Sequence, residues 1–105
     1  MSTDRELLEM AAKAAGIKGA YLWTPDYCGI EINDGRIWNS RDDDGDALRL
    51  LRAVDYGLLV EDGVVKIMNN LGGCVFFADI NGADEMSVIR RAITSVAAAK
   101  SWSEP

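Results

Sequence analysis

Carboxylates gather in one short stretch of this chain. Four of the five residues at positions 42–46 are aspartates, and Gly45 is the remaining one. Oxygen ligands this dense are typical of Ca²⁺ and Mg²⁺ sites, and an acidic surface also attracts a basic protein partner. Aspartates are equally favoured at the start of a helix, where backbone N–H groups point at them. The run therefore indicates a metal site, a docking surface or a helix start.

The spacing of the run does not fit a calcium loop of the EF-hand type. Such a loop has glycine at its sixth position, a polar residue or water-mediated ligand at the ninth and a bidentate glutamate at the twelfth. With Gly45 at the sixth position, Leu48 and Leu51 occupy the ninth and twelfth. The residues that remain as weak candidates for a looser divalent-metal site are Asp42, Asp44 and Asp46.

A helix start explains the run best, because a periodic apolar pattern begins directly behind it. Asp43 or Asp44 is the expected N-cap, and the carboxylates beside it lie at the positive end of the helix. One cap needs one aspartate, so the surplus carboxylates leave a docking surface open as an alternative. The residues expected to contact a partner are Trp38, Asp42, Asp43, Asp44 and Asp46.

The chain offers little for catalysis. It contains no histidine, which removes the commonest general base and the commonest zinc ligand. The two cysteines, Cys28 and Cys74, form no C-x-x-C pair and lie beside apolar segments, so we expect reduced thiols in the core. We therefore predict no enzymatic activity, no catalytic residues and no cofactor.

Composition predicts one globular domain. The 105 residues are 49% apolar, and the formal net charge is −6. An acidic chain is poorly suited to direct nucleic-acid binding, which draws on a basic surface. The chain shows no signal peptide and no apolar run of about 20 residues, so we expect a cytoplasmic protein in a host cell. Residues 1–100 are expected to form the domain, and 101–105 a disordered or loosely packed tail.

Three amphipathic segments are predicted as helices. Thr3 and Glu6 have the spacing of a capping box, and Gly16 suits the end of the helix that follows them. The small residues of this first helix favour close packing on a sheet. The predicted helices span residues 4–15, 45–55 and 84–100.

Shorter apolar segments are predicted as strands. The segment at 74–78 is apolar without alternation, which indicates a central strand covered on both faces. The element order α-β-β-β-α-β-β-α predicts an α/β (α+β) fold. Its layers are expected to form a three-layer α-β-α sandwich with a mostly antiparallel sheet.

The residues around the acidic run also carry a family resemblance. Trp38-Asn39, followed after three variable residues by Asp-Asp-Gly-Asp-Ala-Leu-Arg-Leu at 43–50, resembles the central motif of the phage ABA sandwich domain family. The Ala-Ala-Gly-Ile at 14–17 and the Arg-Arg-Ala-Ile at 90–93 also resemble segments of that family. Two positions depart from its pattern, where this chain has Ser40-Arg41 in place of Pro-Leu and Glu85 in place of proline.

This resemblance implies α-β-α layers and a small phage or prophage protein with no assigned reaction. We therefore expect an accessory protein, a monomer or homodimer, that contacts a host or phage protein. Its acidic surface could inhibit a host or anti-phage defence factor that presents a basic surface. Two alternatives stay open: a divalent-metal module or small metal-dependent enzyme that uses residues 42–46, and a structural protein that self-associates through a strand edge near Trp38.

Overall fold

Helices and strands follow one another nearly as predicted, with one strand added. The computed structural model describes residues 3–32 and 34–103, the last three without their side chains. The described elements are α1 (Asp4–Ala14), β1 (Ala20–Trp23), β2 (Cys28–Glu31), β3 (Ile37–Trp38), α2 (Asp44–Ala53), β4 (Gly57–Glu61), β5 (Val64–Met68), β6 (Cys74–Asp79) and α3 (Glu85–Ser103). The additional strand is β4, which pairs with β5 through a tight hairpin.

The strands form two antiparallel sheets instead of one. The first sheet has the order β1-β2-β3, and the second has the order β4-β5-β6. Every pairing among the described strands joins neighbours in sequence, so each sheet is a simple meander. The mixed α/β class and the antiparallel pairing are therefore confirmed, while the single sheet is replaced by two.

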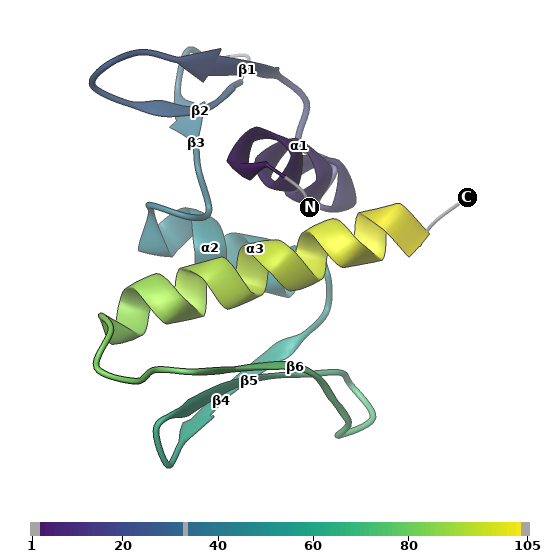
Figure 1. The fold of residues 1–105 in the computed structure, drawn as a ribbon. Helices are drawn as coiled ribbons and strands as arrows, with labels where there is room; N and C mark the ends of the chain where they lie inside the picture. Colours follow the sequence, from purple (N-terminus) through teal and green to yellow (C-terminus); the bar gives the residue numbers. More distant parts are fainter. Residues whose placement is uncertain (1–2, 33, 104–105) are drawn as a thin grey trace.

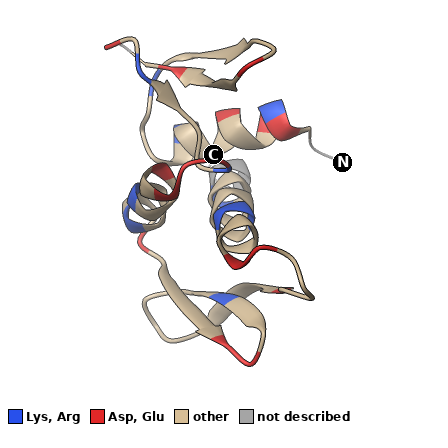
Figure 2. Ribbon diagram, turned by 90° about the vertical axis from the view of Figure 1, so that its left-hand side faces the viewer, with Lys and Arg blue, Asp and Glu red and all other residues tan. Residues whose placement is uncertain are grey.

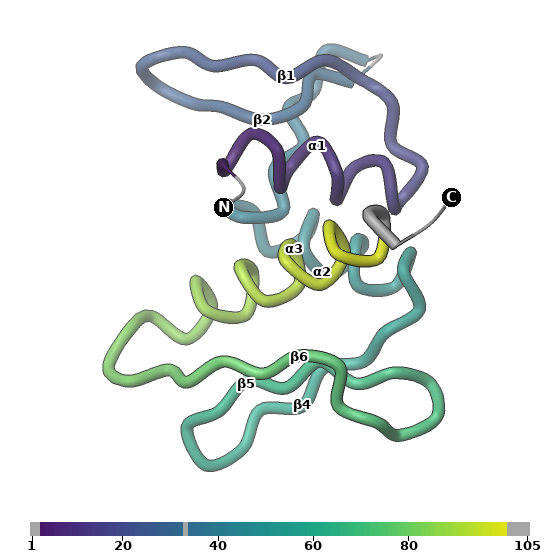
Figure 3. Tube along the Cα trace, turned by 45° about the vertical axis from the view of Figure 1, so that its right-hand side comes forward, coloured from purple at the N-terminus to yellow at the C-terminus, as the bar shows by residue number. Residues whose placement is uncertain are grey.

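The layers also lie in a different order from the expected α-β-α. The helices form the middle of the molecule, with the first sheet on one side and the second sheet on the other (Figures 1 and 3). α3 packs against α1 and α2 and also against β5 and β6. It can do so because it is apolar on more than one side, with Ile89 and Ile93 joined by the small residues Ala92 and Ala97.

Local signals at the helix ends are confirmed. Thr3 and Glu6 form the predicted capping box, and Asp43 is the N-cap of α2. Gly16 follows α1 with a φ of 73°, a conformation that glycine adopts at little cost. α3 continues through residues 101–103, so this part of the predicted loose tail is helical, and residues 104–105 lie outside the described ranges.

The core draws on all three layers. Its largest fully buried side chains include Leu8 of α1, Ile30 of β2, Leu50 of α2, Ile67 of β5 and Ile93 of α3. α1 places Ala11 and Ala12 in this core and packs mainly on α3, although it also touches β2. Within the described ranges, no helix is both long and apolar enough to cross a membrane.

The expected central position of β6 is wrong. β6 is an edge strand, paired with β5 alone among the described strands. Its apolar pattern had predicted cover on both faces, yet Phe77 is 67% exposed. Only the side of this strand that faces α3 is covered, because α3 lies on one face of the second sheet.

Candidate functional site

Asp46 is the buried member of the acidic run. Only 4% of this residue is exposed, and its two carboxylate oxygens are both engaged. The Asn39 backbone N–H donates to Oδ2 at 2.9 Å, and Arg49 Nη2 donates to Oδ1 at 2.8 Å. A charge-assisted hydrogen bond to the backbone fixes the loop before α2 against the first turn of the helix. Asp46 therefore joins β3 to α2.

The other three aspartates also have partners inside the protein. Asp43 accepts the backbone N–H of Gly45 at 2.9 Å, as an N-cap does. Asp44 accepts Arg90 Nη1 at 2.6 Å, which ties the start of α2 to α3. Asp42 accepts Asn39 Nδ2 at 3.1 Å while its own side chain stays exposed. The run is thus a helix start whose carboxylates also bind neighbouring elements.

The three weak metal candidates do not converge on a common point. Asp44 and Asp46 turn their oxygens toward Arg90 and Arg49, whose guanidinium groups take the place that a cation would need. In the described part of the chain, no three acidic, cysteine or histidine residues are grouped closely enough to hold a metal ion.

Ser40 and Arg41 are structural residues whose role the sequence did not reveal. Ser40 is fully buried, and its hydroxyl lies 2.7 Å from the Thr94 hydroxyl of α3. The Arg41 carbonyl accepts Arg90 Nε at 2.8 Å, and the Arg41 guanidinium pairs with Asp4 of α1 at 2.9 Å. Hydrogen bonds and an ion pair therefore connect the loop between β3 and α2 to both α1 and α3. No local pattern in the sequence indicated these contacts.

Trp38 lies beneath the surface. It is 4% exposed, and it lines a recess next to Leu50 and Ala53 of α2. A side chain this buried offers almost no surface to a partner, so the expected contact role of Trp38 is corrected to packing. The self-association edge proposed near it, β3, is only two residues long.

The cysteines belong to separate sheets. Cys28 lies in β2 of the first sheet, where its carbonyl accepts Asn39 Nδ2 at 2.9 Å. Cys74 begins β6 of the second sheet and is exposed, so the expected burial of its thiol is wrong. Both thiols are free.

A second surface stands out on the sheet that α3 covers. In β5, Val65 and Ile67 are buried toward the helices, so Lys66 between them points to the opposite side. Its cross-strand neighbours Leu59 and Phe77 point the same way and are 40% and 67% exposed. We call this side of β4-β5-β6, turned away from the helices, the outer face.

Charge is sparse on this sheet. Within its three strands, Glu61, Lys66 and Asp79 are the charged residues among mostly apolar ones. Figure 2 accordingly shows the ribbon of this sheet mostly tan, with little blue or red. Lys66 Nζ donates to Glu61 Oε1 at 2.9 Å, and this carboxylate raises the pKa of Lys66. Lys66 and Glu61 therefore form an ion pair on the outer face, and the register places Asp79 on the same side. The other side chains of this face, such as Leu59, Val64 and Phe77, are apolar.

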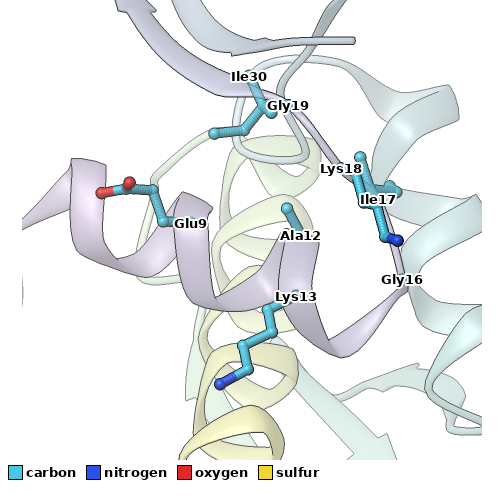
Figure 4. Close-up of a pocket in the computed structure, with 8 residues that line it drawn as sticks. All are labelled: Glu9, Ala12, Lys13, Gly16, Ile17, Lys18, Gly19 and Ile30. Atoms are coloured by element: carbon cyan, nitrogen blue, oxygen red, sulfur yellow. The ribbon is translucent and has the colours of Figure 1, made fainter. Parts of the chain in front are cut away.

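A groove of about 400 Å³ lies on the other side of the molecule, between α1 and the first sheet (Figure 4). Its polar side chains are Glu9, Lys13 and Lys18, around an apolar floor that includes Ala12 and Ile30. These lining residues contain no hydroxyl or thiol nucleophile beside a base, so the groove can accept a small group but carries no acyl- or group-transfer machinery.

Comparison with known proteins adds no relative. Neither family models, nor curated proteins, nor solved structures give a match to this chain.

Proposed function

We propose that this protein acts by binding another protein through the outer face of its second sheet, without catalysing a reaction. The observation that carries the proposal is β6. This strand is apolar toward both sides, yet α3 covers one side and leaves Phe77 in solvent. A strand that is apolar on both faces is typical of a sheet with cover on both faces. A docked protein supplies the missing cover.

Covering Phe77 would contribute a substantial favourable term to the free energy of binding. An aromatic side chain buries about 150–250 Å² when it is fully covered. With 67% of Phe77 exposed, covering it removes enough apolar area for roughly 2–4 kcal/mol at about 25 cal/mol per Å². Phe77 is therefore the expected anchor, and Leu59 and Val75 surround it with further apolar area.

The acidic surface remains a second prediction with weaker support. Asp42, Asp43 and Asp44 are exposed, so a basic partner can approach them. Each of the three already accepts a hydrogen bond within the protein, and Asp44 is paired with an arginine. The phage accessory role implied by the family resemblance likewise stays a prediction, because no family model supports it.

Capture experiments with paired variants separate the two surfaces. The wild-type protein, Phe77→Ser, the double variant Asp42→Asn with Asp44→Asn, and Leu71→Ser are immobilised and exposed to bacterial lysate. Leu71 is 89% exposed in the loop before β6, so its variant is a matched control for the loss of one exposed apolar side chain. We expect Phe77→Ser alone to lose the captured proteins. Loss in the aspartate variant with full capture by Phe77→Ser would reject the proposal in favour of the acidic surface.

A further inference from the structure

The two edges of the second sheet are not equivalent. β4 is exposed along its whole length and consists of Gly-Leu-Leu-Val-Glu. Natural edge strands are usually protected from pairing by lysine, proline or a bulge. β6 has such an irregularity, because the register with β5 shifts between Ile67 and Met68. β4 pairs in unbroken register with β5 and carries its only charge at its last residue, Glu61.

The direction of the backbone hydrogen bonds shows what this edge offers. Asp62 and Gly63 connect β4 to β5 with positive φ values of 52° and 74°, as in a two-residue type I′ turn. The Gly63 carbonyl accepts the Ile80 N–H at 2.9 Å, so residues alternating from Gly63 turn their backbone groups toward β6. By the same alternation, Leu58 and Val60 turn their N–H and C=O groups away from β5, toward the free edge.

We propose that β4 pairs antiparallel with β4 of a second copy of this chain, around a two-fold axis at Leu59. Leu58 then lies opposite Val60 of the partner subunit, and both exchange hydrogen bonds across the axis. Leu59 meets its own copy on the outer face. Glu61 lies opposite Gly57 of the partner subunit, which has no side chain, so no two carboxylates face each other directly.

This register is self-complementary, and that favours a second copy over a foreign strand. A two-fold interface requires one surface to fit itself, which the sequence of β4 does at each of its five positions. The product is a continuous six-stranded sheet whose outer face carries Phe77 of both subunits. The inference does not rest on the proposed function, because pairing uses the edge of β4 and leaves Phe77 on the outer face uncovered.

The strength of this contact is limited by size and charge. A pair of five-residue strands falls short of the roughly 1,200–2,000 Å² buried by standard stable interfaces, so we expect weak, concentration-dependent association. Each copy carries a formal charge of −6, and Asp55 and Asp62 flank the edge strand. Added salt screens this repulsion, so the dimer is expected to strengthen as ionic strength rises.

Mass measurement by light scattering tests the pairing, from roughly 10 µM to 1 mM protein at low and high salt. The Val60→Pro variant removes an N–H that points away from β5, so the hairpin keeps its own bonds. We expect the wild type and Leu71→Ser to approach the dimer mass at high concentration, and Val60→Pro to need at least tenfold more protein. Phe77→Ser should dimerise like the wild type, which separates this inference from the proposed function.

Two results overturn the inference. One is a wild type that stays monomeric over the whole range at high salt. The other is a Val60→Pro variant with a wild-type circular dichroism spectrum that dimerises as well as the wild type. If Val60→Pro does not fold, Leu59→Lys takes its place, because this side chain lies on the outer face and two lysines would then meet across the two-fold axis. Undiminished dimerisation of Leu59→Lys likewise contradicts the pairing.

Discussion

The acidic run at 42–46 and the outer face of the second sheet differ in how fully their side chains find partners within the protein. The run is the most polar stretch of the chain, and each of its four aspartates accepts a hydrogen bond from another residue. The outer face is built from apolar strands, and its central aromatic residue, Phe77, is 67% exposed. The charged stretch thus holds the fold together, while the apolar one is left for contact.

This contrast shows that residue type alone does not mark a functional surface. Charged groups are costly to bury without partners. When arginines pair with it, however, a run of aspartates can stabilise the fold and need not mark a binding surface. Apolar side chains normally stay inside, so an exposed group of them is the feature that requires an explanation. Variants of the two regions can establish whether the run is needed for stability and whether the outer face has no such role.

The largest expected effect comes from Asp46→Ala. This change leaves the buried Asn39 N–H without its acceptor and Arg49 without its ion pair. We expect a loss of about 2–3 kcal/mol in the free energy of unfolding, measured by urea titration. Asp46→Asn keeps an oxygen for the Asn39 N–H and should lose about half as much. Equal losses in the two variants would show that the charge, and not the hydrogen bond to the backbone, is decisive.

A smaller effect is expected from Thr94→Val, which keeps the shape of the side chain. The Thr94 hydroxyl donates to the Arg90 carbonyl at 2.9 Å, so Ser40 is the donor in the buried hydroxyl pair. Valine leaves Ser40 without an acceptor, and we expect a loss of about 1–2 kcal/mol. Ser40→Ala removes the donor instead and should cost less. The reverse order in denaturant titrations would contradict this assignment of the donor.

Lys100→Met should have a comparable or slightly smaller effect. Lys100 Nζ donates to the Val54 carbonyl at the end of α2 at 2.7 Å and lies 5.0 Å from the centre of the Tyr56 ring. Methionine keeps the apolar stem and removes the charge, at an expected cost of about 1 kcal/mol. The cost should be the same at high salt if the hydrogen bond dominates, and should shrink if the charge acts mainly through the helix dipole.

The effect of Phe77→Ser should appear in dye binding. The dye 8-anilinonaphthalene-1-sulfonate reports exposed apolar surface, and the outer face offers such surface. We expect Phe77→Ser to lower the fluorescence of the bound dye clearly more than Leu71→Ser, because Leu71 stands alone in a loop. Equal decreases in the two variants would show that the outer face is not a preferred site.

Local chemistry predicted much of this molecule. The capping box of Thr3 and Glu6, the end of α1 at Gly16 and the cap at Asp43 depend on residues within a few positions of one another. All four aspartates of the run were expected on the surface as contact residues; Asp42, Asp43 and Asp44 are exposed, and the expectation was wrong for the buried Asp46. Its burial depends on Asn39 and Arg49 closing over it.

Contacts between residues far apart in the sequence could not be predicted in the same way. Whether β6 is central or at an edge depends on which strands pair, and the sequence of β6 is compatible with both. The second apolar side of α3, formed by small residues such as Ala92 and Ala97, is equally consistent with contact to a sheet or to another helix. Arg90 reaches Asp44 and the Arg41 carbonyl across 46 and 49 residues of chain, a pairing that no local pattern indicates.

Parallel urea titrations of Phe77→Ser and Asp46→Ala test the central contrast most directly. We expect Phe77→Ser to stay within about 0.5 kcal/mol of the wild-type free energy of unfolding, as surface substitutions usually do. Asp46→Ala should fall by about 2–3 kcal/mol in the same buffer. A loss for Phe77→Ser as large as that for Asp46→Ala would contradict the account, because the outer face would then be part of the packed core.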